Sequence, residues 1–227
     1  MAENRPPALR RVTRSKAEAR EAYDRMSRWY PLLAGSWEQG LRNMALRTLH
    51  VAAGERVLEI GSGPGQELRT LAQAVGPGGW VYGVDLSSQM ARLARARAVK
   101  AGLVSGVDLA QGDAERLPLA AGTMDAVLIS FTLELFDTPA IPLVLAEVQR
   151  VLRPGGRLCV VSLSRAGPAS RMRDLYEWGH DRFPNLLDCR PIFVQASLEA
   201  AGFEILAAAQ ESLFGLPVEI VLGSRTA

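Results

Sequence analysis

The stretch Arg56–Gln66 most constrains the fold of this chain, because it predicts a strand, a glycine-rich turn and a helix start. Its apolar residues, typical of a short buried strand, are Val57, Leu58 and Ile60. The glycines that follow are Gly61, Gly63 and Gly65. Because glycine has no Cβ, the backbone there can turn sharply and approach a ligand closely. Apolar residues then recur at helical spacing over 66–75. This order is typical of a nucleotide-binding α/β unit, in which the helix N-terminus faces the ligand.

The spacing of the glycines favours one kind of ligand. The dinucleotide pattern G-x-G-x-x-G requires glycine at position 66, where this chain has Gln66. Glu59 stands two residues before the first glycine, where a carboxylate repels a pyrophosphate but attracts an ammonium group. S-adenosylmethionine (SAM) carries an ammonium group at its amino-acid end. The loop therefore favours SAM over a dinucleotide, and the alternative is a strand–helix turn with a purely structural role.

Strands and helices alternate along the rest of the chain. Further strands are predicted at 80–84, 107–110, 125–131, 158–163, 204–211 and 217–222. Helical patterns lie between the first five strands, and another covers 192–201. We therefore expect an α/β fold: a Rossmann-like doubly wound sheet of about seven mostly parallel strands, with an antiparallel C-terminal strand pair.

Two acids stand at predicted strand ends, where open α/β sheets bind their ligands. Asp85 closes the second strand, twenty residues after Gly65, a spacing suited to accepting hydrogen bonds from ribose hydroxyls. Asp113 follows the third strand. Both positions agree with a nucleoside-containing ligand, although a solvated acid at a strand end is the simpler alternative for each.

The N-terminal part of the chain is basic and aromatic. Residues 1–30 hold eight arginines or lysines and four acids, a net charge of +4, and include Tyr23 and Tyr30. Two interpretations follow: a helical lid over the ligand site, which we favour, or a helix in peripheral contact with an anionic membrane. We expect residues 1–50 to form this lid and residues 51–227 to form the SAM-binding domain, with an acceptor-side insertion at about 164–192.

Composition excludes several classes of function. The net charge of +2 is too small to indicate a nucleic-acid partner. Cys159 and Cys189 show neither metal-ligand spacing nor a disulfide framework, so we expect no metal and a reducing, cytoplasmic location. Apolar runs are too short for a membrane span, and residues 1–20 lack the apolar core of a secretory signal.

Four segments together resemble the ordered motifs of class I SAM-dependent methyltransferases. They are Val57–Gly65, Val84–Ser87, Gly112–Pro118 and Leu152–Arg157. Within this class, Ile129-Ser130-Phe131 and the upstream pair Tyr23-Asp24 are similar to the ubiquinone/menaquinone-biosynthesis C-methyltransferases.

The resemblance implies a role for each matching residue. The methionine end of SAM would be held by Glu59 and by the loop residues Gly61, Ser62, Gly63 and Gly65. Asp85 would bind the ribose, Leu86 would lie against the adenine, and Asp113 and the Ala114 N–H would bind the adenine edge. Ser130 and Phe131 would border the methyl donor, and Tyr23 and Tyr30 would cover it.

The acceptor is a small or lipid-like molecule, with a prenylated quinol as the leading hypothesis. The alternatives are a phospholipid amine N-methyltransferase acting at the membrane surface and a non-catalytic SAM-binding protein. A base is needed only where the acceptor is a poor nucleophile. His180, in the insertion among aromatic residues, is the candidate base, and Glu134 is a candidate for attracting a cationic amine.

Overall fold

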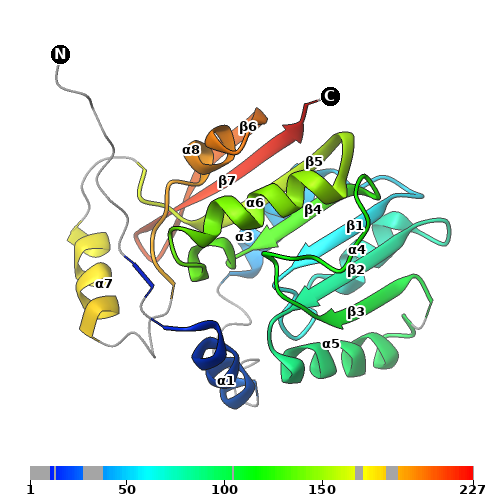
Figure 1. The fold of residues 1–227 in the computed structure, drawn as a ribbon, viewed down its shortest axis with the longest axis horizontal. Helices are drawn as coiled ribbons and strands as arrows, with labels where there is room; N and C mark the ends of the chain where they lie inside the picture. Colours follow the sequence, from blue (N-terminus) through cyan, green and yellow to red (C-terminus); the bar gives the residue numbers. More distant parts are fainter. Residues whose placement is uncertain are drawn as a thin grey trace.

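The computed structural model describes residues 11–12, 14–27, 38–103, 105–166, 171–182 and 189–226 (Figure 1). Its helices are α1 Lys16–Met26, α3 Gln39–Leu49, α4 Leu68–Val75, α5 Ser88–Lys100, η1 Leu133–Leu135, α6 Ala140–Val151, α7 Arg171–Arg182 and α8 Val194–Ala200. Its strands are β1 Arg56–Ile60, β2 Trp80–Asp85, β3 Val107–Gln111, β4 Met124–Ser130, β5 Leu152–Leu163, β6 Phe203–Leu213 and β7 Leu216–Arg225.

All seven strands form one sheet in the order β3-β2-β1-β4-β5-β7-β6. The first five pair in parallel, whereas β7 is antiparallel to both β5 and β6. The chain runs outward from β1 through β2 to β3, and then returns to the other side of β1 for β4 and β5. This reversal leaves a crevice at the carboxyl ends of β1 and β4, where such folds bind ligands. The predicted fold class is confirmed.

Helices cover both faces of the sheet (Figure 1). The apolar sides of α6 and α8 pack on one face, against Leu58, Ile60, Ile129 and Val160 among others. On the opposite face α3, α4 and α5 pack against alternate residues of the same strands, such as Val57 and Leu128. Burial on both faces explains why the central strands read as continuous apolar runs.

Local signals set several helix ends. Ser15 and Glu18 form a capping box at the start of α1, in which each side chain accepts from the other's backbone N–H. Ser87 caps α5 by accepting from Met90 N at 3.1 Å. Gly102, just after α5, has φ +74°, a conformation that suits glycine.

Two parts of the fold differ from the sequence prediction. The strand β5 begins at Leu152 rather than 158, because Leu152 pairs with Met124 before an irregularity in the ladder. Helix α7 occupies Arg171–Arg182, within the segment that we expected to be an insertion. The expected cover residue Tyr30 lies outside the described residues. None of the helices in the described ranges has both the length and the apolar content needed to span a membrane.

Packing on α6 makes a matched test of this architecture. Leu145 is buried in the core, whereas Leu143 on the same helix is 54% exposed. We expect Leu145→Ala to lower the free energy of unfolding by about 2–5 kcal/mol, because it leaves a cavity. Leu143→Ala should change it by less than about 0.5 kcal/mol. Urea denaturation of both variants measures these changes, and equal losses would contradict the placement of α6.

Candidate active site

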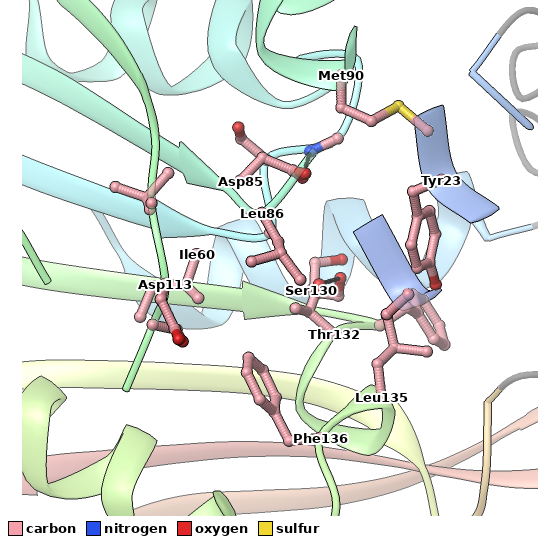
Figure 2. Close-up of a pocket in the computed structure, with 18 of the residues that line it drawn as sticks. Tyr23, Ile60, Asp85, Leu86, Met90, Asp113, Ser130, Thr132, Leu135 and Phe136 are labelled. Carbon is pink, nitrogen blue, oxygen red and sulfur yellow. Dashed lines mark hydrogen bonds between the residues drawn. The ribbon is translucent and has the colours of Figure 1, made fainter. Parts of the chain in front are cut away.

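A pocket opens at the carboxyl ends of β1, β2 and β4, beneath the N-terminal segment (Figure 2). Most sequence-predicted cofactor residues line it: Tyr23, Gly61, Ser62, Gly63, Asp85, Leu86, Asp113, Ala114, Ser130 and Phe131. Figure 2 shows Asp85, Asp113 and Ser130 around the pocket, with Tyr23 projecting from α1. Glu59, Gly65 and His180 are not among the lining residues.

The glycines of the loop have two different roles. A Cβ on Gly61 would lie 2.3 Å from the Thr132 side chain, and one on Gly65 would lie 2.5 Å from Leu68 Cδ1. These two glycines are therefore required by packing within the protein. Gly63 differs, because a Cβ there would meet no protein atom within 4 Å, although its φ is +51°. Its backbone faces open space in the pocket, as expected where a ligand lies close to the main chain.

Asp85 holds the loop and the next helix together. Its Oδ2 accepts from Gly63 N at 2.8 Å, and its Oδ1 accepts from Ser87 N at 2.8 Å. Burial raises the pKa of Asp85, and the two backbone hydrogen bonds oppose that rise. The carboxylate is thus oriented at the pocket wall before any ligand arrives.

Asp113, which we expected to bind the adenine edge, lines the pocket and already has a protein partner. Lys16 Nζ, from α1, lies 2.5 Å from Asp113 Oδ2 and 2.8 Å from Glu115 Oε1. Asp113 Oδ1 also accepts from Glu115 N at 3.0 Å. The acid therefore joins the N-terminal helix to the β3 edge of the pocket.

A buried charged cluster lies below the glycine loop. Arg42 Nη2 lies 2.5 Å from Glu38 Oε2, and Arg42 Nη1 lies 3.2 Å from Glu67 Oε1 and also contacts Gln66. Glu59 is 1% exposed and stands beside Glu67, which is 3% exposed. Burial, and then the Glu67 carboxylate, raise the pKa of Glu59 well above its ordinary value. Arg42 and Glu67 line the pocket, with Glu59 behind them.

The end of β4 forms the wall beside the expected methyl donor. Phe131 has φ +45°, an uncommon conformation for a large side chain, and its N–H donates to Val161 O at 2.8 Å. The Arg42 guanidinium carbon lies 6.0 Å from the centre of the Phe131 ring. Ser130 Oγ is buried and has no partner among the described residues, so it can hydrogen-bond to a bound molecule.

Glu134 and His180 are the two sequence-predicted candidates for acceptor chemistry. Glu134, on η1, is fully buried; its Oε1 accepts from Leu163 N at 3.4 Å, and its Oε2 has no partner within the described ranges. Burial raises the pKa of Glu134 to about 8, so the group is mostly neutral at pH 7. His180, the expected base, lies on α7 with 8% of its surface exposed.

Several lining residues were not expected from the sequence: Lys16, Arg42, Glu67, Leu135, Phe136 and Asp137. Two of these residues, Arg42 and Glu67, stand at positions that could have been recognised from the sequence. Arg42 interrupts the apolar face of α3, where it is 6% exposed, and Glu67 directly follows the glycine loop. Buried charges are rare without partners, so each position marks a polar site.

The geometry of Asp85 yields a direct test. Asp85→Ala should weaken SAM binding by about 1–3 kcal/mol, because hydrogen bonds to a charged acceptor are lost. Asp108→Ala is the matched control, since Asp108 is an exposed acid on the neighbouring strand that accepts from Trp80 Nε1. Calorimetry measures both affinities after circular dichroism shows folded proteins. Unchanged affinity in Asp85→Ala would contradict the assignment.

Comparisons with known proteins agree with this site. Residues 57–156 match a family model described as a methyltransferase domain. The chain is 34% identical over 158 residues to the ubiquinone/menaquinone biosynthesis C-methyltransferase UbiE of Pseudomonas fluorescens. That match covers 69% of this chain and 60% of the relative, so the chain spans less than two thirds of that enzyme's length.

Solved structures share the fold over nearly the whole chain. The cyclase SpnF has a TM-score of 0.78 at 20% identity, covering 94% of this chain and 98% of its own. A SAM-dependent methyltransferase from Aquifex aeolicus has a TM-score of 0.63 at 21% identity, covering 94% and 100%. These structures show the fold alone, whereas the domain match and the 34% identity to UbiE support the assignment of this chain to the class I SAM-dependent methyltransferases, with similarity to the UbiE C-methyltransferases.

Proposed function

We propose that this protein transfers a methyl group from SAM to an uncharged, small or lipid-like acceptor, with a prenylated quinol as the leading candidate. The observation that carries the proposal is the division of the pocket into two ends. Carboxylates and the glycine loop line one end, whereas the other is lined by Val12, Phe131, Leu135, Phe136 and Ala140. The 34% identity to UbiE, whose name gives quinone biosynthesis, supports the quinol.

The residues of the polar end fit the cofactor. The open space in front of Gly63 admits close backbone approach, and the carboxylate of Asp85 suits ribose hydroxyls. Ala114 and Asp113 line the side assigned to adenine, and Leu86 projects between the two ends (Figure 2). Bound SAM supplies a methyl group that its sulfonium already activates toward nucleophiles.

The chain's own contribution is placement and exclusion of water. Holding the acceptor in line with the donor can supply roughly 7–11 kcal/mol of barrier reduction. Ser130 Oγ can accept or donate one hydrogen bond at the junction of the two ends, and Phe131 closes the wall beside it. His180 does not line the pocket, so we give it no step in this mechanism.

Glu134 favours a neutral acceptor over a cationic amine. An ionised carboxylate would attract a cationic amine, but Glu134 is fully buried and its pKa is raised to about 8. A protonated carboxyl offers a hydrogen bond rather than a charge. Glu134 therefore adds little negative charge beside the apolar end at neutral pH, and the Asp137 carboxylate that lines this end is paired with Arg11.

The direct experiment is incubation of the purified chain with isotopically labelled SAM and two acceptors. One is a demethylated prenyl quinol in detergent, and the other is phosphatidylethanolamine in vesicles. We expect mass spectrometry to show transfer of one methyl group to the quinol, and loss of most of this activity in Asp85→Ala. Methylation of the phospholipid alone would reject the neutral acceptor, and SAM binding without transfer to any lipid-extract component would indicate a non-catalytic protein.

We also propose that residues 11–27 act as a lid, because their contacts hold them over the pocket. Arg11 donates to the Asp137 carboxylate from Nε, at 2.9 Å to each oxygen, and from Nη2, at 2.6 Å to Oδ2; Val12 N donates to Asp137 Oδ1 at 2.9 Å. At the other end Asp24 Oδ1 accepts from Ser87 Oγ at 2.5 Å and from Gln89 N. The hydrogen bonds from Arg11 lower the pKa of Asp137 to about 2. The stabilisation from that pair is complete above about pH 4, the ordinary range of aspartate, and is lost as the pH falls toward 2.

The lid makes a prediction that separates it from a membrane anchor. The double variant Arg11→Gln/Lys16→Gln should weaken SAM binding a few-fold and speed proteolysis within residues 11–27, because three ion pairs to the domain are lost. Arg25→Gln is the control, since Arg25 is an exposed cation near Glu21 of the same helix. Unchanged SAM affinity together with lost binding to anionic vesicles would favour the anchor.

A further inference from the structure

The cluster below the glycine loop carries more negative charge than its own cation can balance. The carboxyl groups of Glu38, Glu59 and Glu67 surround one guanidinium, that of Arg42. Asp85 adds a fourth acid close enough to raise the pKa of Glu59 further. Glu59 and Glu67 are at least 97% buried, and an uncompensated charge at such depth costs several kcal/mol. In the protein without ligand, some other change must therefore reduce the charge of these buried carboxyl groups.

Two observations point to a ligand cation rather than to a closed structural network. Glu59 Oε2 is buried and has no hydrogen-bond partner among the described residues. Glu67, beside it, lines the pocket, together with the loop residues Gly61, Ser62 and Gly63. A buried, unsatisfied carboxylate oxygen next to a second carboxylate that lines the pocket is suited to receive a hydrogen-bond-donating cation.

We propose that Glu67 receives the ammonium group of SAM, with Glu59 behind it, and that this binding displaces one proton held by the carboxyl pair. The inference rests on the proposed SAM-dependent function and extends it from the residue expected by sequence, Glu59, to Glu67. In the free protein Glu59, whose pKa is raised well above its ordinary value by burial and by the Glu67 carboxylate, retains this proton, which removes one buried charge. When the ammonium arrives, both carboxylates are ionised and the proton passes to the buffer.

The groups that face the pair support this assignment. From α3, Arg42 contacts Glu67 and holds it toward the pocket, while Glu38 occupies the other guanidinium nitrogen. From β2, Asp85 contributes a like charge. Burial and Glu67 raise the pKa of Glu59, whereas Arg42 lowers it. The net effect favours a retained proton until another cation compensates both acids.

Calorimetric titration of the full chain with SAM in two buffers of different ionisation enthalpy measures the displaced proton. The titration is run at pH 6.5, because a free α-amino group with a pKa of about 7.7–8.0 is then already charged. We expect release of about one proton per SAM bound. S-adenosylhomocysteine, which keeps the ammonium but not the sulfonium charge, should release the same amount. Methylthioadenosine, which lacks the amino-acid end, should bind without proton release.

A Glu67 variant tests whether the released proton depends on the Glu59–Glu67 carboxyl pair. Glu67→Gln should abolish the release and weaken SAM binding about 10- to 100-fold, with little effect on methylthioadenosine. Glu204→Gln removes an exposed carboxylate on β6 and should change neither quantity. If Glu67→Gln does not fold, the ligand series on the unaltered chain decides alone.

The outcomes separate this inference from the proposed function. Tight SAM binding without proton release overturns the inference and leaves the function standing. Equal release with methylthioadenosine also overturns it, because the proton would then come from the ribose side, where Asp85 lies. Absence of any SAM binding overturns both.

Discussion

Strand β1 pairs in parallel with β2 on one side and β4 on the other, and the pocket depends on this register. Ile60 stands opposite Val84 of β2 and Ile129 of β4. The residues that follow, Gly61, Asp85 and Ser130, therefore reach the same edge of the sheet at the same level. A shift of one residue in either ladder would turn alternate side chains to the opposite face and separate them. Burial of apolar residues on both faces fixes the register, so core packing and ligand placement have one cause.

The parts of the site that the sequence predicted depend on local chemistry. A glycine turn after an apolar run, an acid at a strand end and a serine before a helix each act through neighbours in the chain. The cluster around Arg42 differs, because its partner Glu67 lies 25 positions away and no spacing rule joins them. Gln66, which argued against a dinucleotide, contacts Arg42 as part of the same cluster. The sequence pattern did not predict helix α7, because its sequence is strongly polar and gives only a weak apolar stripe.

The charge distribution agrees with the proposed chemistry. Buried acids gather where a zwitterionic amino-acid group would lie, and apolar side chains gather where the acceptor would lie. Between these ends stand Ser130 and the strained Phe131, at the end of β4. Glu134 behind this wall is mostly neutral at pH 7, and the Asp137 carboxylate at the acceptor end is paired with Arg11, so neither acts as an unpaired second counter-ion for the cofactor. A cationic donor is thus attracted to one end alone, and its orientation is set by charge as well as by shape.

The bond between Arg11 and Asp137 joins residues 126 positions apart. During synthesis on the ribosome, residues 11–27 therefore emerge before every partner that holds them over the pocket. Ser87 and Gln89 follow, then Asp113, and the partner of Arg11 comes last, just before α6. Contacts so distant in the chain form late in folding, because the entropy of closing the intervening loop must first be overcome. The nascent domain consequently has an uncovered pocket until α6 has been made, and the earliest segment of the lid is among the last to reach its final position.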